Sequence, residues 1–165
     1  MNDAKRSTIA YAQRDSKKMA ISNTAMSVSI DNQKIILNRH GKEIILTPSG
    51  EEQSYIWPSI SPDGSKLCYY VAGEGCYVCN IDGSNPKYIA HDCRAAQWYD
   101  NNTIVAMADE DDGYFITASA IVVYTLDGRY QELTKKDLVA MYPCVSEGMI
   151  TFATANGDTY LMMVK

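Results

Sequence analysis

The residues of this chain with the clearest chemical potential are a run of carboxylates, Asp109-Glu110-Asp111-Asp112, followed directly by Gly113. Calcium binds several oxygen ligands on a loop that can bend, and closely spaced carboxylates before a glycine can supply them. The sequence lacks the downstream bidentate glutamate of a complete calcium loop, because Tyr-Phe-Ile-Thr follows the glycine. We interpret the run first as a solvated hairpin tip, and a calcium site here would use Asp109, Asp111 and Asp112.

The five cysteines are an odd number, which excludes a fully paired set of disulfides within the chain. Cys76 and Cys79 have the C-x-x-C spacing of redox and zinc sites. They lie in a segment whose pattern predicts a strand, where residues three apart point to opposite faces. No second cysteine pair or histidine motif completes a zinc site. We expect the thiols to act as small core side chains, and we expect no cofactor apart from the calcium just considered.

Residue arrangements typical of an enzyme are not found in the sequence. The two histidines, His40 and His91, fall in different predicted loops, and no G-x-S-x-G motif supplies a nucleophile. The glycine-containing stretch at residues 71–77 leads into a predicted strand, whereas a phosphate-binding loop leads into a helix. We therefore expect no enzymatic activity in this chain.

Charge and hydropathy exclude two classes of partner. The formal net charge of -5 disfavours nucleic acid, because proteins that bind nucleic acid need a positive surface to neutralise phosphates. No apolar run reaches the roughly 18 residues of a membrane-spanning helix, which predicts no membrane insertion. The N-terminal stretch lacks the apolar core of a signal peptide, which indicates a cytoplasmic protein unless a leader has been removed.

Short apolar or alternating runs, rich in Ile, Val, Tyr and Thr and separated by Gly, Asp, Asn and Pro, predict an all-β chain. Four segments repeat the order apolar strand, polar turn, apolar strand. After three of them comes another strand that ends in a second turn, with a glycine in a matching place. Each full unit is expected to be a four-stranded antiparallel meander, and the last unit to lack its outer strand. The four segments are 28–38, 58–70, 95–108 and 142–153, and the three glycines are Gly50, Gly83 and Gly128.

Residues 57–90 carry the clearest copy of this unit, with the corner Ser61-Pro62-Asp63-Gly64 and, later, Ile81-Asp82-Gly83. This segment resembles the repeat of the TolB-type β-propeller family, and residues 124–134 resemble its second half again. The resemblance implies a β-propeller or partial propeller of about four four-stranded antiparallel blades over residues 25–165. Residues 1–24 are then an N-terminal extension or latch strand. The resemblance also implies an extracytoplasmic, periplasmic location if a leader was removed.

Rings in the family that this chain resembles have about six or seven blades, which is more than four units supply. Three explanations stay open. The chain is a fragment of a longer protein, or it forms a homodimer that closes the blade array, or residues 7–13 add the missing outer strand to the last unit and close a small ring. An open array would expose an apolar blade face, which soluble monomers avoid.

In a propeller, the loops that join one blade to the next share a face with the loops between the second and third strands. We expect a protein or peptide partner at this face, because Tyr and Trp dominate binding hot spots. Trp57 and Trp98 are both expected at the entry of an innermost strand, packed between blades or exposed on a rim that binds the partner. The candidate partner-binding residues are His40, Tyr55, Trp57, His91, Arg94, Asp109 and Tyr114.

Together these features predict a non-enzymatic binding or scaffold module. The alternative, also implied by the resemblance, is an accessory propeller domain of a larger enzyme such as a prolyl-oligopeptidase-like serine peptidase.

Overall fold

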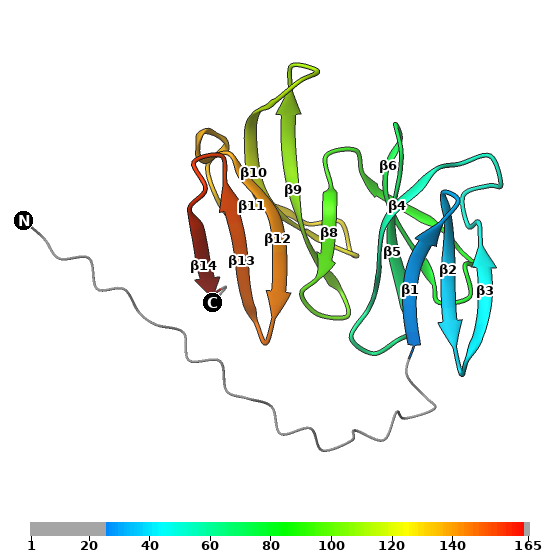
Figure 1. Cartoon of the computed structure of the whole chain (residues 1–165). Helices are drawn as coiled ribbons and strands as arrows, with labels where there is room; N and C mark the ends of the chain where they lie inside the picture. The colour runs from blue at the N-terminus through cyan, green and yellow to red at the C-terminus, as the bar shows by residue number, and fades with distance from the viewer. Residues whose placement is uncertain (1–25, 164–165) are drawn as a thin grey trace, which may run out of the picture.

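The computed structural model describes residues 26–163, whose strands form four antiparallel sheets in a row (Figure 1). The first sheet consists of β1 (Met26–Asp31), β2 (Lys34–Arg39) and β3 (Lys42–Leu46). The second consists of β4 (Tyr55–Ile60), β5 (Lys66–Val71), β6 (Gly75–Asn80) and β7 (Lys87–Ala90). The third consists of β8 (Arg94–Trp98), β9 (Thr103–Asp111), β10 (Ile116–Thr125) and β11 (Tyr130–Glu132). The fourth consists of β12 (Ala140–Ser146), β13 (Met149–Thr154) and β14 (Thr159–Met163), preceded by the 3-10 helix η1 (Lys136–Leu138).

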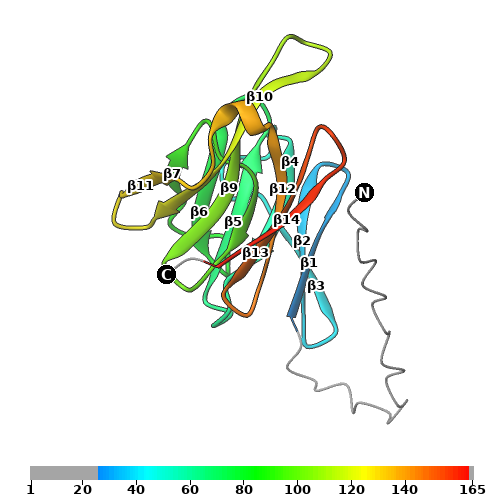
Figure 2. The same ribbon diagram turned by 90° about the vertical axis from the view of Figure 1, so that its left-hand side faces the viewer.

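The prediction of an all-β chain with four antiparallel units is confirmed. The second and third sheets have the four strands expected of a full unit, and the fourth sheet, as far as residues 26–163 describe it, has three strands and no outer one, as expected. In the part of the chain that the structure describes, the sheets do not close into a ring (Figures 1 and 2). The same residues contain no helix long and apolar enough to cross a membrane. The predicted extension 1–24 and the latch segment 7–13 lie outside the described residues.

The Ser-Pro-Asp-Gly corner forms the turn between β4 and β5 through its own side chains. One carboxylate oxygen of Asp63 accepts hydrogen bonds from the Ser61 hydroxyl (2.7 Å), the Ser65 hydroxyl (2.8 Å) and the Ser65 amide (3.0 Å). These donors favour the charged carboxylate and lower the pKa of Asp63 to about 2. The following Gly64 adopts φ +72°, a conformation that glycine reaches without steric cost. The corner therefore specifies the hairpin locally.

Neighbouring sheets bury one apolar core between each pair. The core between the first two sheets contains Leu37 and Tyr69, and the core between the third and fourth contains Ile121 and Phe152. Between the second and third sheets, the indole N–H of Trp98 donates to the Ser59 carbonyl at 2.9 Å. A sheet can bury both of its faces only when a neighbouring sheet covers each of them. The contacts between stacked sheets are therefore the main source of folding stability.

β1, the first described strand of the first sheet, runs antiparallel to β4, β8 and β12, the first strands of the other three sheets. The turns that follow the inner strands of sheets two to four lie side by side, since Asp63 N donates to Asn101 Oδ1 at 3.0 Å and the Tyr99 hydroxyl donates to the Gly148 carbonyl at 3.1 Å. The turn after β1 lies instead at the start of β4, where the Tyr55 amide donates to the Gln33 carbonyl at 3.0 Å. In Figure 1, β1 points up, whereas β8 and β12 point down.

In the described residues the first sheet has three strands, so the prediction of a four-stranded unit is wrong for this sheet. Its β1–β2 turn lies at the start of β4, just as the β5–β6 turn lies beside the loop before β8, where Gly75 approaches the Ala90 carbonyl oxygen and the His91 Cα atom. β1, β2 and β3 therefore have the places and directions of the second, third and fourth strands of a full unit.

Candidate functional site

The inner strands of sheets two, three and four share one irregular position. Trp57 in β4, Ala95 in β8 and Tyr142 in β12 have positive φ angles of 51°, 49° and 51°. At each position the register with the next strand shifts, which marks a β-bulge. Positive φ is costly for residues as bulky as Trp and Tyr, and such strain is concentrated at functional sites. A bulge re-aims its side chain, so the repeated irregularity directs two aromatic rings toward one place.

These bulges border a pocket of about 260 Å³. Its aromatic walls come from Trp57, Tyr142 and two residues of the β9–β10 turn, Tyr114 and Phe115. Tyr114 is 90% exposed, Phe115 76% and Tyr142 58%, so the rings present a large apolar area to solvent. Besides these rings, the pocket is lined by Arg94, Met107, Asp111, Gly113 and Ile116.

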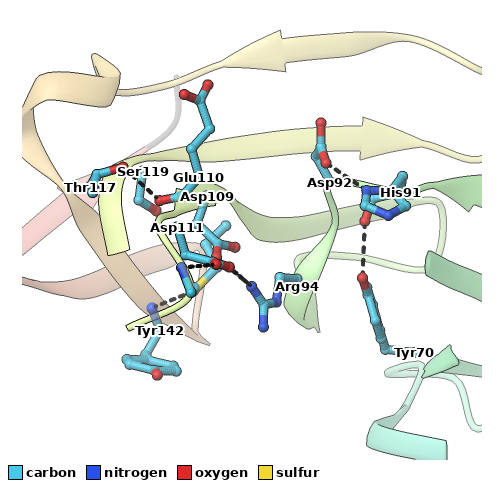
Figure 3. A network of polar contacts seen from close by, with 12 residues as sticks. Tyr70, His91, Asp92, Arg94, Asp109, Glu110, Asp111, Thr117, Ser119 and Tyr142 are labelled. Atoms are coloured by element: carbon cyan, nitrogen blue, oxygen red, sulfur yellow. Dashed lines mark hydrogen bonds and ion pairs between the residues drawn. The ribbon is translucent and has the colours of Figure 1, made fainter. Parts of the chain in front are cut away.

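Arg94 connects the pocket to the acidic run. Its guanidinium donates to Asp109 at 2.6 Å and lies 3.6 Å from a carboxylate oxygen of Asp111. The same guanidinium lies over the Trp57 ring, 5.8 Å from its centroid, at a distance suited to a cation–π contact. Figure 3 shows Arg94 reaching from β8 to the carboxylates on β9, with Tyr142 near the same strand. The contacts fix the arginine as one wall of the pocket.

Asp109 is the one buried carboxylate of this network. Its side chain is fully inaccessible, and its Oδ1 atom has no hydrogen-bond partner among the described residues. Burial raises the pKa of Asp109 above its usual range, and the adjacent Arg94 opposes this rise. A buried oxygen with an unused lone pair is costly, so a donor from water or a ligand would be favourable here.

The acidic run lies mainly within a strand. β9 continues to Asp111, beyond the predicted strand end at residue 108, and β10 begins at residue 116. Side chains alternate along a strand, so Asp109 and Asp111 share Arg94 while Glu110 points to the other side and binds Lys136 at 2.6 Å. In the turn itself, Asp112 accepts from the Tyr114 and Phe115 amides at 2.9 and 2.8 Å, and Asp111 accepts from the Gly113 amide at 3.0 Å.

Of the three predicted calcium ligands, Asp109 and Asp111 therefore face Arg94, and Asp112 binds the amides of the turn. Among residues 26–163, no group of three or more His, Cys, Asp or Glu side chains could hold a metal ion. The geometry gives the calcium site no support, and that site stays a prediction.

Of the predicted partner-binding residues, Trp57, Arg94, Asp109 and Tyr114 lie in or beside the pocket. His91 lies in the loop before β8, where its Nδ1 atom is 2.9 Å from Asp92 (Figure 3).

The other two predicted residues lie elsewhere. Tyr55 is fully buried in the core between the first two sheets, and its hydroxyl donates to the Gly50 carbonyl at 2.8 Å. His40 lies in the β2–β3 turn, at the end of the molecule opposite the β9–β10 turn (Figure 1). Neither residue lines the pocket. Their part in partner binding stays a prediction.

The prediction that Trp57 and Trp98 both lie at the entry of an inner strand is wrong. Trp57 occupies the bulge in the middle of β4, whereas Trp98 is the last residue of β8 and is buried. The residue that matches Trp57 is Tyr142, which the sequence analysis did not single out. The signal was present: Trp57 and Tyr142 each precede a proline in an inner strand, which distinguishes this pair from the other aromatics.

Comparisons with known proteins identify the fold but not a family. No protein-family model matches the sequence, and a search of curated proteins finds no match. The structure is similar to TolB from Acinetobacter baumannii, with 18% identity and a TM-score of 0.58 over 84% of this chain and 40% of that one. An oligogalacturonate lyase in complex with manganese matches with 17% identity and a TM-score of 0.53, over 77% of this chain and 39% of the lyase. The computationally designed Ika4 protein matches with 8% identity and a TM-score of 0.55, over 87% and 94% of the two chains.

TolB and the lyase are β-propeller proteins, so these matches support the resemblance of the sheets to a TolB-like propeller. This chain spans about two fifths of the length of either protein. At such low identity the likeness concerns the fold alone.

Proposed function

We propose that this chain is a non-enzymatic binding module that holds a protein or peptide partner on the face formed by its β9–β10 turn and inter-sheet loops. The observation that carries the proposal is the pocket bordered by the two strained aromatic residues, Trp57 and Tyr142. Positive φ at two bulky residues is retained at a cost, and here both positions serve the same pocket.

The size and lining of the pocket favour one side chain of a larger partner. Pockets for drug-sized molecules have volumes of about 300–1,000 Å³ and enclose most of their ligand. This pocket has a volume of about 260 Å³, and its outer walls, Tyr114 and Phe115, are largely exposed. Exposed aromatic rings around a small pocket are the composition of a protein-binding hot spot.

Peptide selection tests this function. Panning the full chain against a displayed random peptide library should yield peptides that bind it, with dissociation constants measured by calorimetry. Replacing both exposed rings (Tyr114→Ser with Phe115→Ser) should weaken binding about tenfold, because hot-spot aromatics contribute at this scale.

Tyr130→Ser supplies the matched control, since Tyr130 is a half-exposed ring on β11 away from the pocket. Peptides that bind equally well to the double variant, or that lose affinity only in the control, would contradict the proposal.

A further inference from the structure

We propose that the pocket takes a positively charged side chain, a lysine ammonium or an arginine guanidinium, with Asp111 as its counter-ion. This inference rests on the proposed binding function and names the chemistry of the group that is bound.

The charge around the pocket favours a cation. Four carboxylates, Asp109 to Asp112, face two cationic side chains, Arg94 and Lys136, which leaves a local excess of two negative charges. Lys136 is paired with Glu110 on the other side of β9 and does not line the pocket. Asp111 does line it, and its side chain is 49% exposed. A carboxylate is thus available to a ligand at the pocket wall.

The walls independently favour the same charge. The faces of aromatic rings carry negative potential, so ammonium and guanidinium groups are attracted to them. The pocket already contains one such contact, because the Arg94 guanidinium lies over the Trp57 ring and at the same time pairs with the Asp109 carboxylate. A ligand cation between Asp111 and the rings of Tyr114 and Tyr142 would repeat this arrangement.

An anionic ligand fits less well. Arg94 is the one cation among the residues that line the pocket, and Asp109 at 2.6 Å and Asp111 at 3.6 Å already neutralise it. A bound carboxylate would meet Asp111 and the negative ring faces. The buried Oδ1 atom of Asp109, which lacks a donor, adds to the demand for hydrogen-bond donors at this end of β9.

The test is an NMR titration of the full chain with three small probes that differ only in charge class. They are Nα-acetyl-lysine N-methylamide, its Nε-acetylated neutral form, and Nα-acetyl-glutamate N-methylamide. The lysine probe should shift the indole N–H signal of Trp57, with binding that weakens as salt is added. The Trp98 indole is an internal control, since it is buried and bonded to Ser59. It should not move.

The matched variants are Asp111→Asn and Asp127→Asn. The first variant removes the counter-ion but keeps a side-chain oxygen. That oxygen can still accept the hydrogen bond that Asp111 accepts from the Gly113 amide at 3.0 Å. Asp111→Asn should weaken binding of the lysine probe about fivefold, the upper range for a half-exposed ion pair. Asp127→Asn makes the same charge change in the β10–β11 turn and should leave binding unchanged.

Equal or tighter binding of the neutral or glutamate probe, or no shift of the Trp57 signal by lysine, overturns the inference. Selected peptides that depend on Tyr114 and Phe115 but contain no essential Lys or Arg would overturn it while leaving the proposed function intact. If the lysine probe binds at this pocket but no selected peptide does, the proposed peptide-binding function is overturned and the preference of the pocket for a cation stands.

Discussion

Individual cysteines in this chain differ sharply in environment. Cys68, Cys76, Cys79 and Cys93 are buried, and Cys144 on β12 is exposed. The Cys68 and Cys76 sulfurs lie 3.4 Å apart in the core between the second and third sheets. The hydrogen bond to Cys76, together with burial, raises the pKa of Cys68 well above its usual range. Burial also raises the pKa of Cys79 to about 12. The side-chain hydrogen bonds with Cys68 and Cys93 instead lower the pKa of Cys76 to about 5. Because the thiolate is the reactive form, burial alone is expected to keep Cys76 from reacting, whereas Cys68 and Cys79 are also kept in the unreactive thiol form.

Thiol titration with a disulfide reagent such as DTNB checks this expectation. At pH 8 the native protein should show one rapidly reacting thiol per chain, Cys144, and all five should react after unfolding in guanidinium. A pKa raised by folding means that Cys79 stays a protonated thiol as the pH rises, until it approaches 12. Cys144→Ser should abolish the fast phase, and a second fast thiol in that variant would contradict the burial described above.

Among the structural elements, the β5–β6 turn shows how closely two strands approach. A Cβ atom on Gly75 (φ +138°) would lie 2.6 Å from the Ala90 carbonyl oxygen and 3.0 Å from the His91 Cα atom. Gly73, two residues earlier, has φ +80° and open space around its missing Cβ. A side chain at Gly73 would meet backbone strain alone, whereas a side chain at Gly75 would also clash with the neighbouring backbone.

Substituting alanine at each glycine measures the difference. Gly73→Ala should lower the free energy of unfolding by about 1 kcal/mol, the cost of the left-handed conformation. Gly75→Ala should lower it by about 3 kcal/mol, because the β7 backbone must also move. Urea unfolding followed by circular dichroism gives both values. Similar losses of stability in the two variants would contradict the prediction, because they would mean that the β7 backbone moves at little cost.

At this scale the sequence predicts strands and turns well because their signals are local. Period-two patterns identify the strands, and the Asp63 corner specifies its own hairpin. The place of β1–β3 within a unit was not predicted, because a polar turn between two apolar strands has the same local pattern whichever two strands of the unit it joins. The extension of β9 through Asp109 and Asp111 was hidden for a related reason. Charged residues suggest a loop, whereas here the pairing with β10 and the contacts with Arg94 and Lys136, which are distant in sequence, stabilise them in a sheet.

For the molecule as a whole, the two ends of the stack differ. The outward face of the first sheet is largely polar, with Ser27 and Ser29 exposed, although Ile45 is 69% exposed. The outward face of the fourth sheet presents Leu161 and Met163, which are 64% and 70% exposed, beside the exposed Cys144. Exposed apolar sheet faces favour association. Of the three explanations that the sequence leaves open, this face favours the homodimer, and we expect it to pair through the fourth sheets.

Light scattering on a sizing column tests the association. The wild-type chain should elute with the mass of two chains, and Leu161→Glu should shift it to the mass of one, because a buried unpaired charge opposes pairing. Ile45→Glu places the same charge on the first sheet and should leave the dimer intact. A wild-type monomer contradicts the expectation, and loss of the dimer in both variants would favour closure of the array through both ends.

The arrangement of the sheets also shows how such a chain could lengthen. The first strands of sheets two, three and four share one polarity, and each lies on the sheet that precedes it. The fourth sheet offers the same kind of surface, so a further unit could lie on it with the same contact. Duplication of a whole repeat would therefore need no new type of interface between sheets.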